Sequence, residues 1–244
     1  MENNSSASVR SWQGALILGL SIIIAAGVFS LAFYSARQTG DTLTVTGSTK
    51  QKITSDSVKW RGGFTRNAPI ADLKGGYAQM KADQQAVLKF FKDNGIAEKQ
   101  VDISPVFVDK PYQYDRNLPQ EYVLRQDVLV QSGEVEKINK LSKNIQKLID
   151  TGVIFSSQAL EYYYTKLPEL RINLLGDAVK DAKLRAEKLL ESSGKGVGAL
   201  KTVSTGVVQV LPVNSTDISD YGNFDTSTID KEAMVTVKAT FEIK

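Results

Sequence analysis

Four aspartates stand close together near the end of the chain, in the stretch STDISDYGNFDTSTID: Asp217, Asp220, Asp225 and Asp230. Several carboxylates in one flexible loop could bind calcium, because calcium takes oxygen ligands. The spacing does not match an EF-hand loop, and Asp, Asn, Ser and Gly are also the residues that turns require. The stretch therefore predicts a polar loop, with calcium binding as the alternative and no metal site assigned.

A second group of residues mixes aromatic and basic side chains. The stretch KPYQYDRNLPQEY and its continuation bring together Tyr112, Tyr114, Tyr122, Lys110, Arg116 and Arg125. Such interleaving can stack nucleobases. However, 30 basic against 27 acidic residues give a net charge of only +3, which argues against a nucleic-acid partner. A hairpin tip is predicted here, with a binding or oligomer contact as the alternative.

The glycine-rich stretch SSGKGVG could be read as a phosphate-binding loop around Lys195. Such a loop needs a strand before its glycines and a helix after them, so that amide groups at the helix start point at the anion. Here a predicted helix precedes the glycines and a predicted strand follows. Gly196 also stands where a Ser or Thr would follow the lysine. The stretch therefore predicts the end of a helix.

Two residue types are missing from the sequence, and their absence limits the chemistry. Without cysteine there are no disulfides, thiolate nucleophiles, zinc–thiolate sites or iron–sulfur clusters. Without histidine the usual base near neutral pH is lost. A G-x-S-x-G nucleophile motif is also absent. The sequence predicts a protein that is not an enzyme, with no catalytic residues and no cofactor.

The first part of the chain predicts a membrane anchor. No charged side chain occurs from Ser11 to Ala36, a run longer than the roughly 20 residues that cross a bilayer as a helix. Trp12 and Tyr34 lie near its ends, where such rings favour the headgroup level. We expect a polar head at 1–11, a transmembrane anchor in contact with the lipid bilayer at 12–36, and a linker at 37–41.

A cleaved signal peptide is the alternative to this anchor, with the small residues SLA from Ser30 to Ala32 as the cleavage site. Arg10 and Arg37 bracket the apolar run, so the positive-inside rule gives no clear orientation. The short polar head favours an exported body. The prediction is a single-pass protein of the inner (cytoplasmic) membrane, whose body faces the periplasm or the cell exterior.

Residues 42–244 predict one α+β domain, in which helices pack on one face of a mostly antiparallel sheet. Its last strand alternates most clearly, with Val235, Val237, Ala239 and Phe241 on one face. Gly62 and Gly63 inside a strand indicate a bulge or a close backbone approach. The expected strands are 42–48, 56–68, 101–108, 121–132, 157–165, 199–211 and 232–243. The expected helices are 70–94, 135–150 and one from Leu167 that ends at Gly194.

One pattern occurs three times: a helix, a terminal glycine and then a strand, in FFKDNGI, LIDTGVI and LLESSGKGVGAL. Glycine just after a helix adopts the left-handed conformation at low cost. The last of these helices has an alanine-rich stripe that allows close packing on a sheet or on another helix. Its predicted buried residues are Leu167, Leu174, Leu175, Ala178, Ala182, Ala186 and Leu189.

The order of elements resembles the SIMPL-domain family of bacterial envelope proteins. The resemblance covers about Thr42 to Ile243 and rests on LTVTGS, a helix ending in NGI, VDISPVFVDKPYQYD, YVLRQDVLVQ and AVKDAKLRAEKLL. It implies βαββ-type units in an exported or membrane-anchored domain that assembles into oligomers, with some members linked to envelope stress. It implies no catalytic residues. The Asp-rich loop and SVKWRGGF depart from the pattern.

These observations lead to three hypotheses for the function. The first is a membrane-anchored, extracytoplasmic domain that acts without catalysis, through a homo-oligomer or an envelope protein partner. The second is a small-molecule binding module whose pocket is lined by Trp60, Tyr162, Tyr163 or Tyr164. The third is a hydrolase built from carboxylates or serine.

Overall fold

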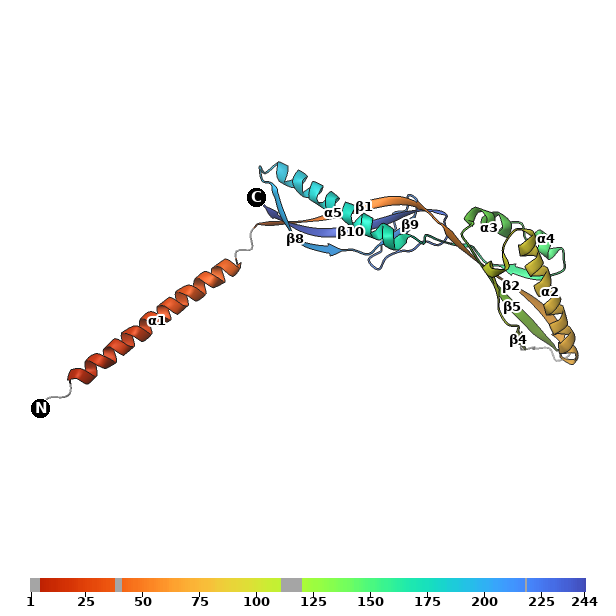
Figure 1. Ribbon diagram of the computed structural model, residues 1–244, viewed down its shortest axis with the longest axis horizontal. Coiled ribbons are helices and arrows are strands. Elements are labelled where there is room, and N and C mark those ends of the chain that lie inside the picture. Colours follow the sequence, from red (N-terminus) through yellow and green to blue (C-terminus); the bar gives the residue numbers. More distant parts are fainter. Residues whose placement is uncertain (1–4, 38–40, 111–119, 218) are drawn as a thin grey trace. The chain divides into compact units, whose positions relative to one another are not determined.

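The computed structural model describes residues 5–37, 41–110, 120–217 and 219–244. The chain forms two compact units that interleave in sequence. Unit 1 comprises Met1–Val45, Lys183–Val203 and Ala239–Lys244, and unit 2 comprises Thr46–Ala182 and Ser204–Lys238. Figure 1 shows the elements along the chain.

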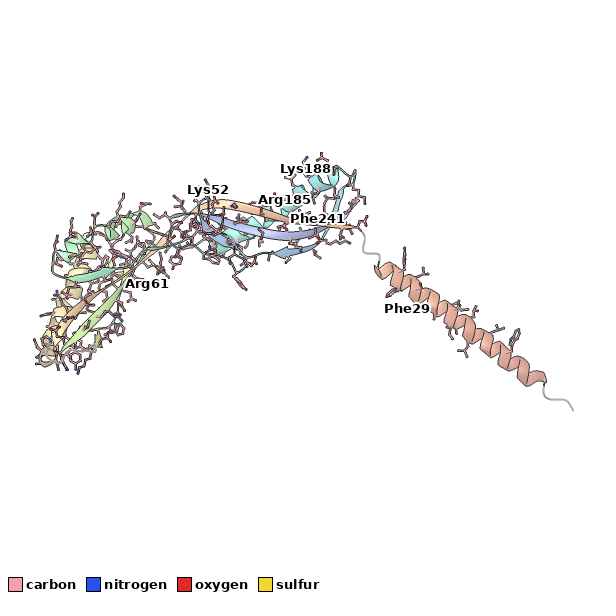
Figure 2. All side chains as sticks on the ribbon, turned by 180° about the vertical axis from the view of Figure 1, so that it is seen from behind. Phe29, Lys52, Arg61, Arg185, Lys188 and Phe241 are labelled. Atoms are coloured by element: carbon pink, nitrogen blue, oxygen red, sulfur yellow. The ribbon has the colours of Figure 1, made fainter. Side chains whose placement is uncertain are left out.

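Helix α1 (Ser5–Arg37) contains the apolar stretch. Its segment Gly14–Ser35 is long and apolar enough to cross a membrane, and all of its most apolar window is exposed. The aromatic ring of Phe29, labelled in Figure 2, stacks on that of Phe33 at a centroid distance of 6.1 Å. The prediction of one N-terminal apolar helix is confirmed.

Unit 1 also contains parts of four elements: β1 (Thr42–Thr54), α5 (Leu167–Glu191), β8 (Val197–Thr205) and β10 (Asp230–Ile243). Gly196 and Lys244 exchange two backbone hydrogen bonds, and Ile243 N donates to Asp41 O. The buried side chains here are Val45, Ala186, Leu190, Ala239 and Phe241. Unit 1 thus buries apolar side chains from its helix and from two of its strands.

A six-stranded antiparallel sheet lies within unit 2. Its order is β3 (Val101–Ile103), β5 (Glu121–Ser132), β2 (Ser57–Pro69) and β6 (Ile154–Ser157). Strands β4 (Phe107–Asp109) and β7 (Glu161–Tyr163) pair with β5 and β2. Its helices are α2 (Leu73–Asp93), α3 (Val135–Ser142) and α4 (Gln146–Ile149), with short 3-10 turns at Ile70–Asp72 and Glu98–Gln100 (Figure 1).

The core of this sheet follows the alternation of the sequence. Val58, Trp60 and Phe64 point to the helix side of β2 and are buried with Phe91 and Ile138. The rings of Trp60 and Phe91 meet edge to face at a centroid distance of 5.5 Å. Helices therefore cover one face of an antiparallel sheet, and the predicted α+β class is confirmed.

The second sheet has four strands in the order β1-β10-β8, and β9 (Gln209–Pro212) pairs with β10. Every odd residue of β10 from Lys231 to Phe241 is buried. Within unit 2, Ile53, Val210 and Val235 pack with Leu170 and Leu174 of α5. Figure 1 shows α5 running along one face of these strands.

The three predicted helix-terminal glycines are confirmed. Gly95, Gly152 and Gly194 have φ values of 74°, 85° and 66°, in the left-handed region. A side chain there would be strained, so glycine ends each helix and turns the chain towards its next strand.

Four expected elements are divided in the structure. Residues 101–108 form two strands, because Pro105 has no N–H for the ladder and the pairing with β5 shifts by one residue there. The strand at 199–211 breaks before β9, where Gly206 N donates to Thr236 O. The expected helix at 135–150 breaks where Asn144 N donates to Leu141 O. Of the expected strand at 157–165, only Ser157, the last residue of β6, and the three residues of β7 are in strands.

The pair Gly62–Gly63 makes a close approach, and the register of β2 with β5 continues through it without a bulge. A Cβ atom on Gly62 would lie 2.5 Å from the ring of Phe155. Glycine is thus required where an aromatic ring lies on the strand. The expected close approach is the correct alternative.

The alanine stripe of α5 packs closely against strand β1. Within unit 2, a Cβ atom on Gly47 of β1 would lie 2.5 Å from the backbone nitrogen of Ala182 and 2.7 Å from its Cβ. The strand and helix backbones approach this closely because neither Gly47 nor Ala182 carries a larger side chain. The buried residues are Leu170, Leu174, Ala178, Ala182, Ala186 and Leu190. Leu189 was wrongly expected among them; it lies outside this four-residue repeat and is 59% exposed.

Candidate functional site

The Asp-rich loop between β9 and β10 holds a buried ion pair. Lys231 has a side chain that is 1% exposed, and that of Asp225 is 8% exposed. Lys231 Nζ donates to Asp225 Oδ2 at 3.0 Å and to Asp225 O at 2.7 Å. Ser227 and Thr228 also donate to the same carboxylate through their backbone N–H and hydroxyl groups. A charged pair thus closes the base of the loop.

The environment of Asp225 keeps its carboxylate ionised. Burial would raise its pKa, but hydrogen bonds from Ser227, Thr228 and Lys231 outweigh burial and hold the pKa well below its usual range. The ammonium of Lys231 supplies the positive charge that a metal ion would otherwise bring. Asp230 accepts from Thr54 Oγ1 at 2.9 Å, while Asp217 and Asp220 are exposed.

The four aspartates have different surroundings: Asp225 pairs with Lys231, Asp230 accepts from Thr54, and Asp217 and Asp220 are exposed. They therefore give no support to the calcium alternative. Among the described residues, there is no group of three or more acidic side chains that could hold a metal ion. The buried position of Lys231 was not predicted from the sequence. Extending the alternation of β10 back from Val235 places Lys231 on the buried face, which was the available signal.

The four aromatic residues proposed to line a pocket do not come together in one. Trp60 and Tyr162 are buried in the core of the six-stranded sheet, where Trp60 Nε1 donates to Ser157 Oγ at 2.8 Å. Tyr163 faces the opposite side of the sheet, with Lys59 4.9 Å from its ring centroid. Tyr164 packs against the core beneath α5. The four residues therefore lie in three separate parts of the structure.

Of the aromatic–basic group, Tyr112, Tyr114 and Arg116 lie outside the described residues. Arg125 lies over the ring of Phe107 at 5.5 Å and 3.7 Å from Asp127 Oδ1. Tyr122 is partly buried against the core, and Lys110 is exposed. Lys195, in the glycine tail, pairs with Asp41 at 3.2 Å. Lys195 therefore makes a structural contact within unit 1.

The open face of the six-stranded sheet is polar and internally paired. Arg61, labelled in Figure 2, pairs with Glu161, which also accepts from the hydroxyl of Tyr163. The bond from Tyr163, followed by the charge of Arg61, lowers the pKa of Glu161, and the same bond raises the pKa of Tyr163. Both values move away from neutrality, which makes the pair unsuited to acid–base catalysis.

Strand β8 forms an edge of the four-stranded sheet. From Ala199 to Thr205 every residue is exposed, and the strand VGALKTVST has one charged residue and no proline. Because β8 pairs only with β10 among the described strands, every second residue of β8 turns its N–H and C=O groups away from β10. Such a row of backbone groups is a template for another strand.

The usual protection of an edge strand is weak here. Lysine side chains on an edge discourage pairing, but Lys201 is ion-paired with Glu242 of the neighbouring β10. The hydrogen bond and the charge of Lys201, followed by a hydrogen bond from the backbone N–H of Ala199, lower the pKa of Glu242. By contrast, β1 carries Lys50 and Lys52, and its Ser48 N–H donates to Asp181 of α5 at 2.8 Å. Of these two edges, β8 is therefore the one available for contact.

Comparison with known families matches residues 43–241 to the family described as "SIMPL: Protein of unknown function (DUF541)". The match covers most of the chain, and the chain belongs to this family. A search of curated proteins finds no match. The fold, the family and an N-terminal helix able to span a membrane together define a SIMPL domain behind an apolar helix.

Proposed function

We propose that this protein is a membrane-anchored, extracytoplasmic contact protein that acts without catalysis, by self-association or by binding an envelope protein partner. The observation that carries the proposal is the exposed edge of β8, which pairs with β10 alone among the described strands and has little charge to protect it. Strand addition at such an edge supplies affinity through main-chain hydrogen bonds. A role in envelope stress fits a contact protein at the membrane.

The anchor supports the same proposal. Only residues 38–41 separate α1 from β1, so the two elements are joined by at most about 18 Å of extended chain. If α1 stays in the bilayer, the start of β1 lies near the membrane surface. The body is then held where membrane proteins and other copies of the chain are met.

We expect the body to face outward. The chain has no cysteine, so a single introduced cysteine reports its own location. In cells expressing the full chain, Gln79→Cys on the exposed side of α2 should react with a membrane-impermeant maleimide before lysis. Ser6→Cys in the polar head should react only after lysis. The reverse pattern would reject the orientation, and recovery of the chain from the soluble fraction would reject the anchor.

Replacing both Leu200 and Val203 by lysine should weaken self-association about tenfold or more, because charged side chains on an edge strand oppose pairing with another strand. The fold should survive, because both side chains are already exposed. The matched variant Leu200→Thr/Val203→Thr adds no charge and should associate normally. Sedimentation of the full chain in detergent over a wide concentration range measures this. A wild-type chain that stays monomeric throughout would reject self-association.

A further inference from the structure

The tip of the loop between β9 and β10 displays two aromatic rings in solvent. Tyr221 is 95% exposed and Phe224 is 58% exposed. Asp217 and Asp220 are exposed beside them, and we call these four residues the aromatic–acidic tip. Exposed tyrosines are common anchors of protein interfaces, because the ring buries a large apolar area and its hydroxyl still hydrogen-bonds.

The backbone of the tip is held in place. The side-chain amide of Gln209 donates to Ser219 O at 2.7 Å and accepts from Ser219 N at 3.2 Å. Val210 N donates to Asn223 O at 2.7 Å, and Asp225 N donates to Val210 O at 2.8 Å. The rings are thus presented from an ordered backbone, which reduces the entropy lost when they are buried.

The tip is also negative. Residues 217–230 contain four aspartates and no basic residue. Asp225 is neutralised by Lys231, and Asp230 accepts from Thr54. Asp217 and Asp220 form no ion pair with a cation of the described chain. Their charge is therefore available to a positively charged partner surface.

A basic pocket of unit 2 has the complementary character. Residues 137–149, which cover α3 after its first two residues and all of α4, hold four lysines and no acidic residue. A cavity of about 560 Å³ is lined there by Asn94, Lys137, Lys140, Leu141, Asn144, Gln146 and Lys147, which we call the lysine pocket. Leu141 contributes an apolar surface, as an inserted ring requires.

Two of these lysines are available for a new contact. Lys137 Nζ donates to Gly95 O at 2.7 Å and to Glu134 at 2.9 Å, so it is already bound. Lys140 and Lys147 are exposed, and neither forms an ion pair with a carboxylate of the described residues. The neighbouring Asp150 accepts instead from Gln146 at 2.8 Å.

We propose that the aromatic–acidic tip of one copy docks in the lysine pocket of a second copy. Tyr221 enters the cavity against Leu141, and Asp217 and Asp220 pair with Lys140 and Lys147. The inference rests on the proposed self-association but uses a surface separate from β8. A second copy is the occupant because one chain carries both halves of a matched set of charges. Two different patches meet, so the contact is heterologous and builds rings or chains of copies.

Cross-linking in the full chain tests this directly. Thr216→Cys chains, which keep all four residues of the tip, mixed with Asn144→Cys chains in detergent should form disulfide-linked heterodimers under mild oxidation. Each variant alone should give about tenfold less cross-linked product. The double variant should give a ladder of multimers, as a heterologous contact requires. A mixture that cross-links no better than the single variants overturns the proposal.

Charge reversal supplies the second test, with the same cysteines as reporters. Lys140→Glu/Lys147→Glu in the pocket chain, or Asp217→Lys/Asp220→Lys in the tip chain, should lower cross-linking about tenfold. Combining both reversals should restore it. Lys74→Glu/Lys81→Glu on the exposed side of α2 makes the same change in net charge and should have no effect. Absent recovery in the combined pair, or an equal loss in this control, overturns the proposal.

The two proposals fail separately. If Leu200→Lys/Val203→Lys abolishes association while the cysteine pair never cross-links, β8 is the contact and the tip is not. If cross-linking persists in Leu200→Lys/Val203→Lys, the tip docks without β8. If the wild-type chain is monomeric and the cysteine pair is unreactive, both are rejected.

Discussion

Replacing Lys231 by alanine is expected to lower the free energy of unfolding by about 3–5 kcal/mol. The substitution removes the buried ammonium and leaves the carboxylate of Asp225 ionised without its positive partner. The same change opens a cavity beside the start of β10. Urea unfolding of the variant and the wild type, followed by circular dichroism, measures the difference.

The pH dependence of the same pair gives an independent check. Hydrogen bonds from Ser227, Thr228 and Lys231 place the folded pKa of Asp225 below its unfolded value near 4. Its contribution to stability is therefore complete above that value and declines as the pH falls through the acid range. Lys231→Ala should flatten this acid decline, because the pKa of Asp225 rises when its cation is lost. A loss of less than about 1 kcal/mol at neutral pH, as for a surface pair, would contradict this account.

Replacing Gly47 by leucine should cost about 3 kcal/mol, the upper part of the range for overpacking. The new side chain would start 2.5 Å from Ala182 N and 2.7 Å from Ala182 Cβ, so α5 must move off β1. No low-energy rotamer avoids this overlap, because the first side-chain atom already makes it. The measurement is again the free energy of unfolding, with the far-ultraviolet spectrum as a check of the fold.

Gly176 is the matched control for this prediction. It lies in α5, but a Cβ atom there would meet nothing within 4 Å. Gly176→Ala should therefore stabilise the protein by about 0.5–1 kcal/mol through helix propensity. Equal effects of the two substitutions would show that the close approach at Gly47 has no energetic weight.

Local features of this fold could be predicted from the sequence because local physics decides them. The left-handed glycines after three helices, the alternation of β10 and the apolar run of α1 each depend on residues close together in the chain. The pair Gly62–Gly63 indicated either a bulge or a close approach, and the ring of Phe155, which is distant in the sequence, decides for the close approach. In each case the conformational preference of a few residues agrees with the final structure.

Features that depend on distant partners could not be predicted in the same way. The position of β8 at an edge follows from the pairing order of β1, β10 and β8, which the local pattern does not contain. The alanines of α5 indicated close packing, but not that Gly47 would be the residue they meet. Asp225 resembled a calcium ligand because its partner, Lys231, was not recognised as buried.

The few residues between α1 and β1 restrict how far the body can move from the end of α1. With α1 in a bilayer, the bodies of all copies would then meet within one thin layer rather than throughout a volume. Tethering of this kind raises the local concentration of the partners, so surfaces too weak to hold together in dilute solution can stay engaged. The β8 edge and the lysine pocket are suited to such a setting, in which the extent of assembly would depend on the density of the chain in the membrane.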